Sequence, residues 1–241
     1  MRGRTMITTD EVVIDESNIL DVLRRSHALH VKNANDIEYL INYEKGDQPL
    51  QRKKTYRPDI DCQCSDNVAN EVTEFNTGFK WGNAITLVQT GDGSDEEISE
   101  AVSELNKQYA MARIKAKTQE LGRYVEICGI CNVYVDINME WRKGKPLFEL
   151  DVLDPRSSFV VRSSYYPDKR IMLGVTYRHD SISGNTYYTC YTKDQRFEVV
   201  NLQSEVTSPS KWAHMERSGE ENPLHIVPIT EYIRSYDLSL I

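Results

Sequence analysis

The residues that decide the fold read ICNVYVDI at 130–137, RKGKP at 142–146 and LFELDVL at 147–153. On both sides of the RKGKP turn, apolar residues alternate with polar ones at the period of two that is typical of strands. The segment therefore predicts an antiparallel β-hairpin. The chain before it follows helical spacing and the chain after it follows strand spacing. This order predicts an α+β fold rather than an α/β fold.

Two helices are predicted near the N-terminus, where apolar residues recur three or four positions apart. The first begins at Ser17, which has the side chain of an N-cap, and continues for about four turns. The second is short, starting at Asn35 and ending at Gly46. Residues 1–16 show little periodicity and several charges, so we expect them to form a mobile arm or a docking strand.

A third helix is predicted from Ser65 to the Trp81-Gly82 pair. It is amphipathic, and its apolar face consists of Val68, Val72, Phe75 and Phe79. A short strand is expected at Asn83–Gln89. Ser94 and Glu97 then form a capping box, which predicts one long helix of more than about 20 residues that reaches about Val125. Gly122 and Gly129 mark places where this helix is expected to kink or end.

A β-meander is predicted after the hairpin. Short β-prone runs separated by turn residues lie at 158–161, 171–177, 186–192 and 196–200. A polar loop is expected at 201–222. The apolar segment His225–Tyr232 that follows is expected to pair with the sheet or to close the domain.

The composition is that of a folded protein with a polar surface. Hydrophobic residues make up 39% of the 241 residues and charged residues 27%, with a mean hydropathy of −0.55. The net charge of −8 argues against a large DNA-gripping surface, because DNA affinity comes mainly from Lys and Arg. No apolar run of about 18 residues exists and the N-terminus turns acidic, so neither a membrane span nor a secretion signal is predicted.

Four of the five cysteines form the strongest candidate metal site. Cys62 and Cys64 make one close pair, and Cys128 and Cys131 make a second pair with the spacing common in zinc sites. The hypothesis is a small zinc-binding regulatory protein. Buried, inert thiols explain these cysteines equally well. A thioredoxin-like redox pair is disfavoured, because here a helix precedes the strand.

Motifs of catalysis are missing from the sequence. It contains neither a phosphate-binding G-x-x-x-x-G-K-[ST] nor a nucleophile G-x-S-x-G. The five histidines have no partner pattern, so we expect surface or boundary positions for them. Carboxylates such as Asp151 and Asp154 could in principle pair for acid–base work, yet Asp154-Pro155 more simply ends a strand. We therefore predict no enzyme, and no catalytic, cofactor-binding or metal residues.

Tyrosine and basic residues crowd the predicted meander. Interleaved with Arg162, Lys169, Arg170 and Arg178, the tyrosines could stack on the bases of single-stranded nucleic acid. We favour packing of tyrosines across neighbouring strands instead. The tyrosines in question are Tyr165, Tyr166, Tyr177, Tyr187, Tyr188 and Tyr191.

Ordered blocks along the chain resemble the portal proteins of tailed phages of Gram-positive bacteria. The match rests on colinearity over about residues 17–232, because each block alone is weak. The blocks are Tyr39–Arg52, Thr77–Asn83, Leu105-Asn106, Gly129–Asp136, Leu153–Pro155, Phe159–Val161, Gly174–Tyr177, Cys190–Thr192 and Val227–Tyr232.

The resemblance implies a non-enzymatic structural protein. In that family, twelve copies form a ring at one capsid vertex of the virion, and assembly takes place in the bacterial host cytoplasm. The implied partners are other copies of the chain, the major capsid and scaffolding proteins, the terminase, and head-completion or connector proteins. Double-stranded DNA passes through the ring during packaging and ejection.

The resemblance covers only the N-terminal half of a portal protein, which implies the outer wing. We expect a wing-like α+β domain at 17–232 and a tail at 233–241, where the family's stem would begin. The stem and the channel loop are missing, so no channel residues are assigned. A single domain of a longer protein, a prophage remnant and a protein split over two chains all remain open.

Overall fold

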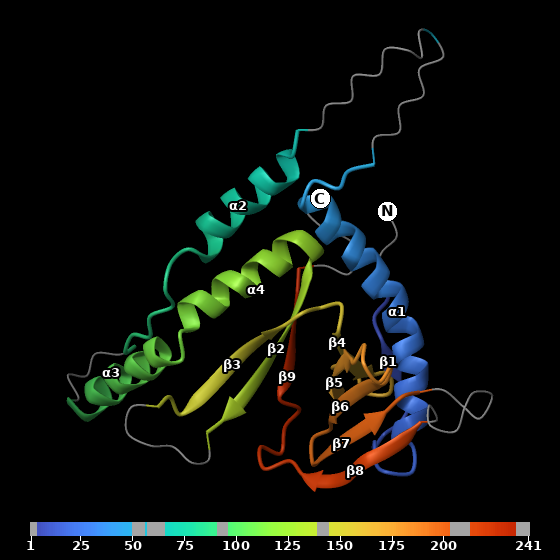
Figure 1. The fold of residues 1–241 in the computed structure, drawn as a ribbon. Coiled ribbons are helices and arrows are strands. Elements are labelled where there is room, and N and C mark those ends of the chain that lie inside the picture. The colour runs from blue at the N-terminus through green and yellow to red at the C-terminus, as the bar shows by residue number, and fades with distance from the viewer. Residues whose placement is uncertain are drawn as a thin grey trace.

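The structure, a computed structural model, describes residues 4–49, 56, 66–90, 96–138, 145–202 and 213–234. Its helices are α1 (Ile19–Glu44), α2 (Val68–Trp81), α3 (Glu96–Met111) and α4 (Ile114–Cys128) (Figure 1). Its strands are β1 (Thr8–Thr9), β2 (Ile130–Ile137), β3 (Phe148–Leu153), β4 (Ser158–Ser163), β5 (Ile171–His179), β6 (Thr186–Tyr191), β7 (Gln195–Val200), β8 (His214–Glu221) and β9 (Ile229–Ile233). The α+β prediction is confirmed.

The strands of the described residues form two sheets. The larger has the order β1-β4-β5-β6-β7-β8, and the smaller has the order β3-β2-β9. The predicted hairpin is β2 paired with β3, with Asn132 opposite Leu153. The predicted meander is β4 to β7, and β9 pairs with β2 as expected for the last apolar segment.

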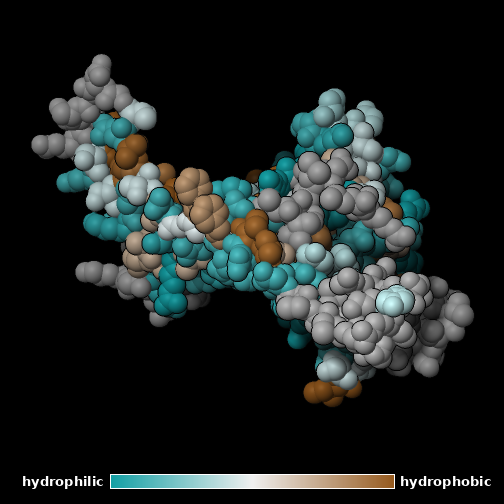
Figure 2. Space-filling model, turned by 90° about the horizontal axis from the view of Figure 1, so that it is seen from above, coloured by the Kyte–Doolittle hydropathy of each residue, from teal (hydrophilic) through white to brown (hydrophobic). Residues whose placement is uncertain are grey.

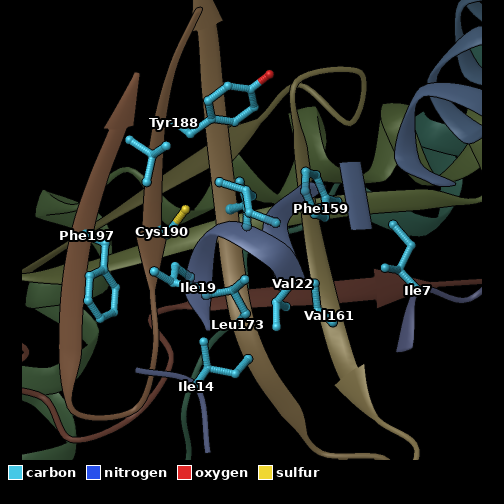
Figure 3. Packing of buried hydrophobic residues seen from close by; sticks show 13 residues of the cluster. Ile7, Ile14, Ile19, Val22, Phe159, Val161, Leu173, Tyr188, Cys190 and Phe197 are labelled. Atoms are coloured by element: carbon cyan, nitrogen blue, oxygen red, sulfur yellow. The ribbon is translucent and has the colours of Figure 1, made fainter. Parts of the chain in front are cut away.

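The main core lies between α1 and the six-stranded sheet. Ile19 and Leu23 of α1 are fully buried in one cluster with Leu173 and Phe197 of the sheet. Figure 3 shows Ile19, Leu173 and Phe197 in this core. Of the mobile arm and the docking strand expected for the N-terminal stretch, the described residues contain a short docking strand, β1. Thr8 and Thr9 pair in parallel with β4, and Ile7 and Ile14 of the same stretch join the core.

The predicted pair of N-terminal helices is wrong, because α1 is one helix of 26 residues. Its first half packs in the main core, whereas Ile37 and Ile41 pack against Ile127 and Cys128 of α4. Between the two cores the helix surface is polar. That polar stretch interrupts the apolar pattern without breaking the helix.

The predicted long helix at 94–125 is also wrong. Arg113 adopts a left-handed conformation with φ of 54° and separates α3 from α4. The break lets the end of α3 reach β3: Gln108 accepts from the Leu147 amide at 3.1 Å, and Tyr109 packs edge-on against Phe148. The capping box at Ser94 and Glu97 is not tested, since residues 91–95 and the Glu97 side chain lie outside the described part.

Three further expectations need correction. Gly122 does not kink α4, although Gly129 ends it with a left-handed φ of 71°. The expected polar loop contains an edge strand, β8, paired with β7. Segment 83–90 is not a strand: in place of a neighbouring strand, the Asn106 side chain bonds both backbone groups of Leu87 at 2.9 Å.

Candidate functional site: an apolar arm and a hollow

The apolar face of α2 points outward. Phe75 and Phe79 are 72% and 78% exposed and stack with their ring centroids 6.2 Å apart. Val68 and Val72 on the same face are exposed as well. A surface helix ordinarily buries its apolar face against the core. Here the four residues form an unpaired stripe, which we call the α2 stripe.

The opposite, polar face of α2 packs on α4 because it carries the partners of two buried carboxylates. Glu44 and Glu126 are each 2% exposed. Asn70 of α2 donates to Glu44 at 2.8 Å, and Lys80 of α2 donates to Glu126 at 2.9 Å. A buried carboxylate without a partner is strongly unfavourable. These contacts therefore fix which face of α2 turns inward.

Arg123 of α4 joins the same network. It donates to Glu44 at 2.7 Å and also to Glu74 of α2. Burial disfavours the guanidinium charge, but the bonds to Glu74 and the nearby Glu44 outweigh it and raise the pKa of Arg123. Glu126 also forms an ion pair with a second cation, Arg234, at 3.3 Å. Arg234 directly follows β9. The network thus ties α1, α2, α4 and the end of β9 together.

A close approach between Trp81 and Gly122 completes the contact between α2 and α4. A Cβ atom at Gly122 would lie 2.3 Å from Cγ of Trp81, far inside van der Waals contact. Only glycine fits at this point of α4. The indole ring takes the space and holds the C-terminal end of α2 against α4.

The exposed apolar character continues beyond α2. Ile85 and Val88 in segment 83–90 and Ile98 and Leu105 on α3 are also exposed. From above, brown and tan residues form an interrupted line along the arm that extends to the left (Figure 2). We refer to α2, segment 83–90 and α3 as the helical arm. By sequence, residues 66–111 carry nine acidic and two basic side chains, a net charge of −7 out of −8 for the chain.

A hollow of about 560 Å³ lies in another part of the molecule, beside the segment that leads into α1. Its apolar lining consists of Val12, Val13, Ile14, Tyr166, Ile171 and Met172. Val12 and Val13 are largely exposed, with 47% and 64% of their surface accessible. Charges of both signs surround the hollow, including Arg170, Lys193, Asp194 and Glu221.

The two sheets meet at a junction that brings three of the resemblance blocks together. Asn132 of β2 donates to the Ser158 carbonyl at 2.9 Å, and Arg162 of β4 pairs with Glu231 of β9 at 3.0 Å. Gly174 of β5 has no room for a side chain, since a Cβ atom would lie 2.8 Å from Ile229. Asn132, Gly174 and Glu231, one residue from each of these three blocks, therefore lie where the two sheets meet.

Of the four candidate zinc ligands, the structure describes Cys128 and Cys131. Cys62 and Cys64 lie outside the described residues. Cys128 and Cys131 are buried in different clusters, one with Ile37 and the other with Leu121. Burial raises the pKa of both thiols to about 12, which opposes the thiolate form that zinc requires. Within the described ranges, no group of three or more His, Cys, Asp or Glu side chains could hold a metal ion.

His30 is buried, which corrects the sequence expectation, whereas His27 is half-buried and fits the expected boundary position. His30 stacks on Phe159, and its Nε2 lies 3.0 Å from the Arg156 carbonyl, so that nitrogen carries the proton. His27 packs edge-on against Tyr177 and Tyr188. Burial lowers the pKa of both histidines, that of His30 to about 4.

The carboxylates considered for catalysis have structural partners. Asp154 accepts from the Arg156 amide at 2.8 Å and pairs with its guanidinium, which confirms the strand-ending turn. Burial opposes ionisation, but these bonds keep the pKa of Asp154 below its usual value. Asp151 pairs with Lys117 at 3.1 Å.

The tyrosines of the meander pack across strands, as favoured from the sequence. Tyr177 lies opposite Tyr188, with ring centroids 5.4 Å apart. Arg178 covers the ring of its cross-strand neighbour Tyr187 at 4.9 Å. These rings contact neighbours within this chain, whereas Tyr165 in the turn after β4 is 68% exposed.

A comparison with known protein families matches residues 29–237 to the family described as "Phage portal protein, SPP1 Gp6-like". The chain belongs to this portal protein family. The resemblance read from the sequence blocks is therefore confirmed, and the match runs from within α1 past β9. Portal proteins are structural proteins of the phage capsid vertex, and this is the role that the family gives the chain.

Among curated proteins, no match to this portal-family chain was found. Throughout the described ranges, no helix combines the length and the apolar character that a membrane crossing demands.

Proposed function

We propose that this chain is the wing region of a ring-forming phage portal protein. In this proposal residues 17–232 form the wing domain and residues 233–241 lead toward the stem. The chain acts by self-association, in a dodecamer according to the resemblance, and catalyses no reaction. The observation that carries the proposal is the α2 stripe, because soluble monomers rarely expose such contiguous apolar surfaces.

The proposed ring sits at one vertex of the capsid in the virion and assembles in the cytoplasm of the bacterial host. It contacts the major capsid and scaffolding proteins, serves the terminase during packaging, and carries head-completion or connector proteins. DNA passes through during packaging and ejection. The net charge of −8 is compatible with a ring through which DNA passes, because a strongly basic channel would bind the DNA and retain it.

Self-association is the property to test. Mass photometry and negative-stain imaging of the purified chain, over a range of protein concentrations and at capsid-like salt, should reveal closed assemblies with rotational symmetry. A chain that stays monomeric throughout would contradict ring formation by these residues.

A further inference from the structure

From the α2 stripe and the hollow we infer that copies of this chain associate head to tail, with the α2 stripe of one copy seated in the Val12–Val13 hollow of the next. This inference rests on the proposed function and gives its self-association a specific interface. The Phe75–Phe79 pair is the projecting part and the hollow is the receiving part.

The stripe has the character of an interface rather than of an ordinary surface. An aromatic side chain presents about 150–250 Å². With 72% and 78% exposure, Phe75 and Phe79 alone offer roughly 300 Å². Together with the exposed residues of segment 83–90 and α3, the helical arm approaches the scale of about 800 Å² that each partner contributes to a standard interface.

We assign the α2 stripe of a second copy of this chain as the occupant of the hollow. The hollow of about 560 Å³ falls in the size range of binding pockets, roughly 300–1,000 Å³, and has room for two aromatic rings. The apolar lining of the hollow matches the apolar stripe, and the charges around it nearly balance. Burial of apolar surface is therefore the driving force that we assign to this contact.

The position of the two surfaces favours association between copies over contact within one copy. In Figure 1, α2 lies at the upper left, whereas the segment that leads into α1 lies at the lower right, across the large sheet. The stripe of a copy therefore does not reach the hollow of the same copy. Two different surfaces on one protomer make a heterologous contact, the kind that generates rings when the rotation closes.

The test uses two variants with complementary defects and one control, all in the full chain. Phe75→Asp/Phe79→Asp damages only the stripe. Val13→Asp damages only the hollow, because the carbonyl of Val13, not its side chain, accepts from Asn18. The control is Ile182→Asp, which changes a residue that is 97% exposed in the turn between β5 and β6.

Wild type and control should assemble equally in mass photometry, and each damaged variant alone should associate at least about 100-fold more weakly. An equal mixture of the two damaged variants should give dimers that grow no further, because each mixed pair retains one intact stripe and one intact hollow. Circular dichroism should show the same fold for all four chains.

The outcomes separate the inference from the proposed function. A monomeric wild type contradicts the ring and, with it, this interface. If wild type assembles and the stripe variant assembles equally well, the interface is wrong while the ring stands. A mixture that remains monomeric overturns the pairing of stripe with hollow and indicates contact between like surfaces.

Discussion

Phe197 and Phe79 are the same residue type in two parts of this molecule, and their surroundings are opposite. Phe197 of β7 is fully buried in the main core, whereas Phe79 of α2 is 78% exposed. In the six-stranded sheet, apolar side chains hold the fold together. In α2, bonds to the buried carboxylates Glu44 and Glu126 and the packing of Trp81 hold the helix in place, and the side chains of the α2 stripe are left outside. The comparison teaches that apolar side chains stabilise the sheet side, whereas in the arm they are available for the self-association that we propose.

Of the substitutions predicted here, the replacement of Phe197 in the main core should reduce the free energy of unfolding most. Phe197→Ala removes a fully buried ring and leaves a cavity, so we expect the free energy of unfolding to fall by about 3–5 kcal/mol. Urea denaturation followed by circular dichroism measures the change. A loss below about 1 kcal/mol would show that this core tolerates cavities and would weaken the contrast with the arm.

Acid should destabilise the sheet side of the molecule through His30. The pKa of this histidine is about 4 in the fold and 6.5 in the unfolded chain, so the unfolded chain binds the extra proton between these values. The contribution of neutral His30 to the free energy of unfolding is therefore fully present above pH 6.5. It is lost as the pH falls toward 4, and the total loss is up to about 3 kcal/mol.

Thermal unfolding between pH 7 and pH 4 measures this loss. His30→Gln has no proton to gain there and retains a donor for the Arg156 carbonyl, so its melting temperature should change less with pH. His27 titrates in the same cluster and leaves a smaller residual dependence. An unchanged pH dependence in His30→Gln would assign the acid sensitivity to other groups.

The contact between α2 and α4 should be more sensitive at Gly122 than at Gly78. Gly122→Ala places a methyl group 2.3 Å from Trp81, so we expect a loss of about 1–3 kcal/mol and faster amide hydrogen exchange in α2. Gly78→Ala is the matched control. Its Cβ atom meets nothing within 4 Å, and alanine favours a helix over glycine by about 1 kcal/mol.

Hydrogen exchange read by mass spectrometry distinguishes the two variants. Equal protection of α2 in both would show that the indole ring moves aside without cost, which contradicts the tight contact between the helices.

The sheets could be predicted from the sequence because alternation alone defines them. The pairs β2 with β3 and β4 through β7 all follow period-two segments between turn residues. β8 was missed because its sequence, HMERSGEE, is that of a polar edge strand. The break at Arg113 was missed because neither glycine nor proline marks it.

The candidate surface was harder to predict than the fold. Periodicity located α2 and its apolar face correctly, but it carries no information on which face turns inward. That choice depends on Glu44 and Glu126, which lie on two other helices and meet Asn70 and Lys80 only in the folded chain. Likewise, the hollow is lined by segments that are far apart in sequence.

The smallest expected effect completes the comparison. Phe79→Ala removes the same ring as Phe197→Ala, but from a site that is already 78% exposed. The unfolding free energy of the monomer should change by less than about 0.5 kcal/mol, as for other surface substitutions. Dilute protein and urea denaturation give this value without interference from association. If Phe79→Ala costs as much as a core substitution, the ring supports the fold of its own chain and the arm is not a free surface. If the monomer is unchanged while assembly weakens, the ring acts between copies, which is the role that the comparison with Phe197 assigns to it.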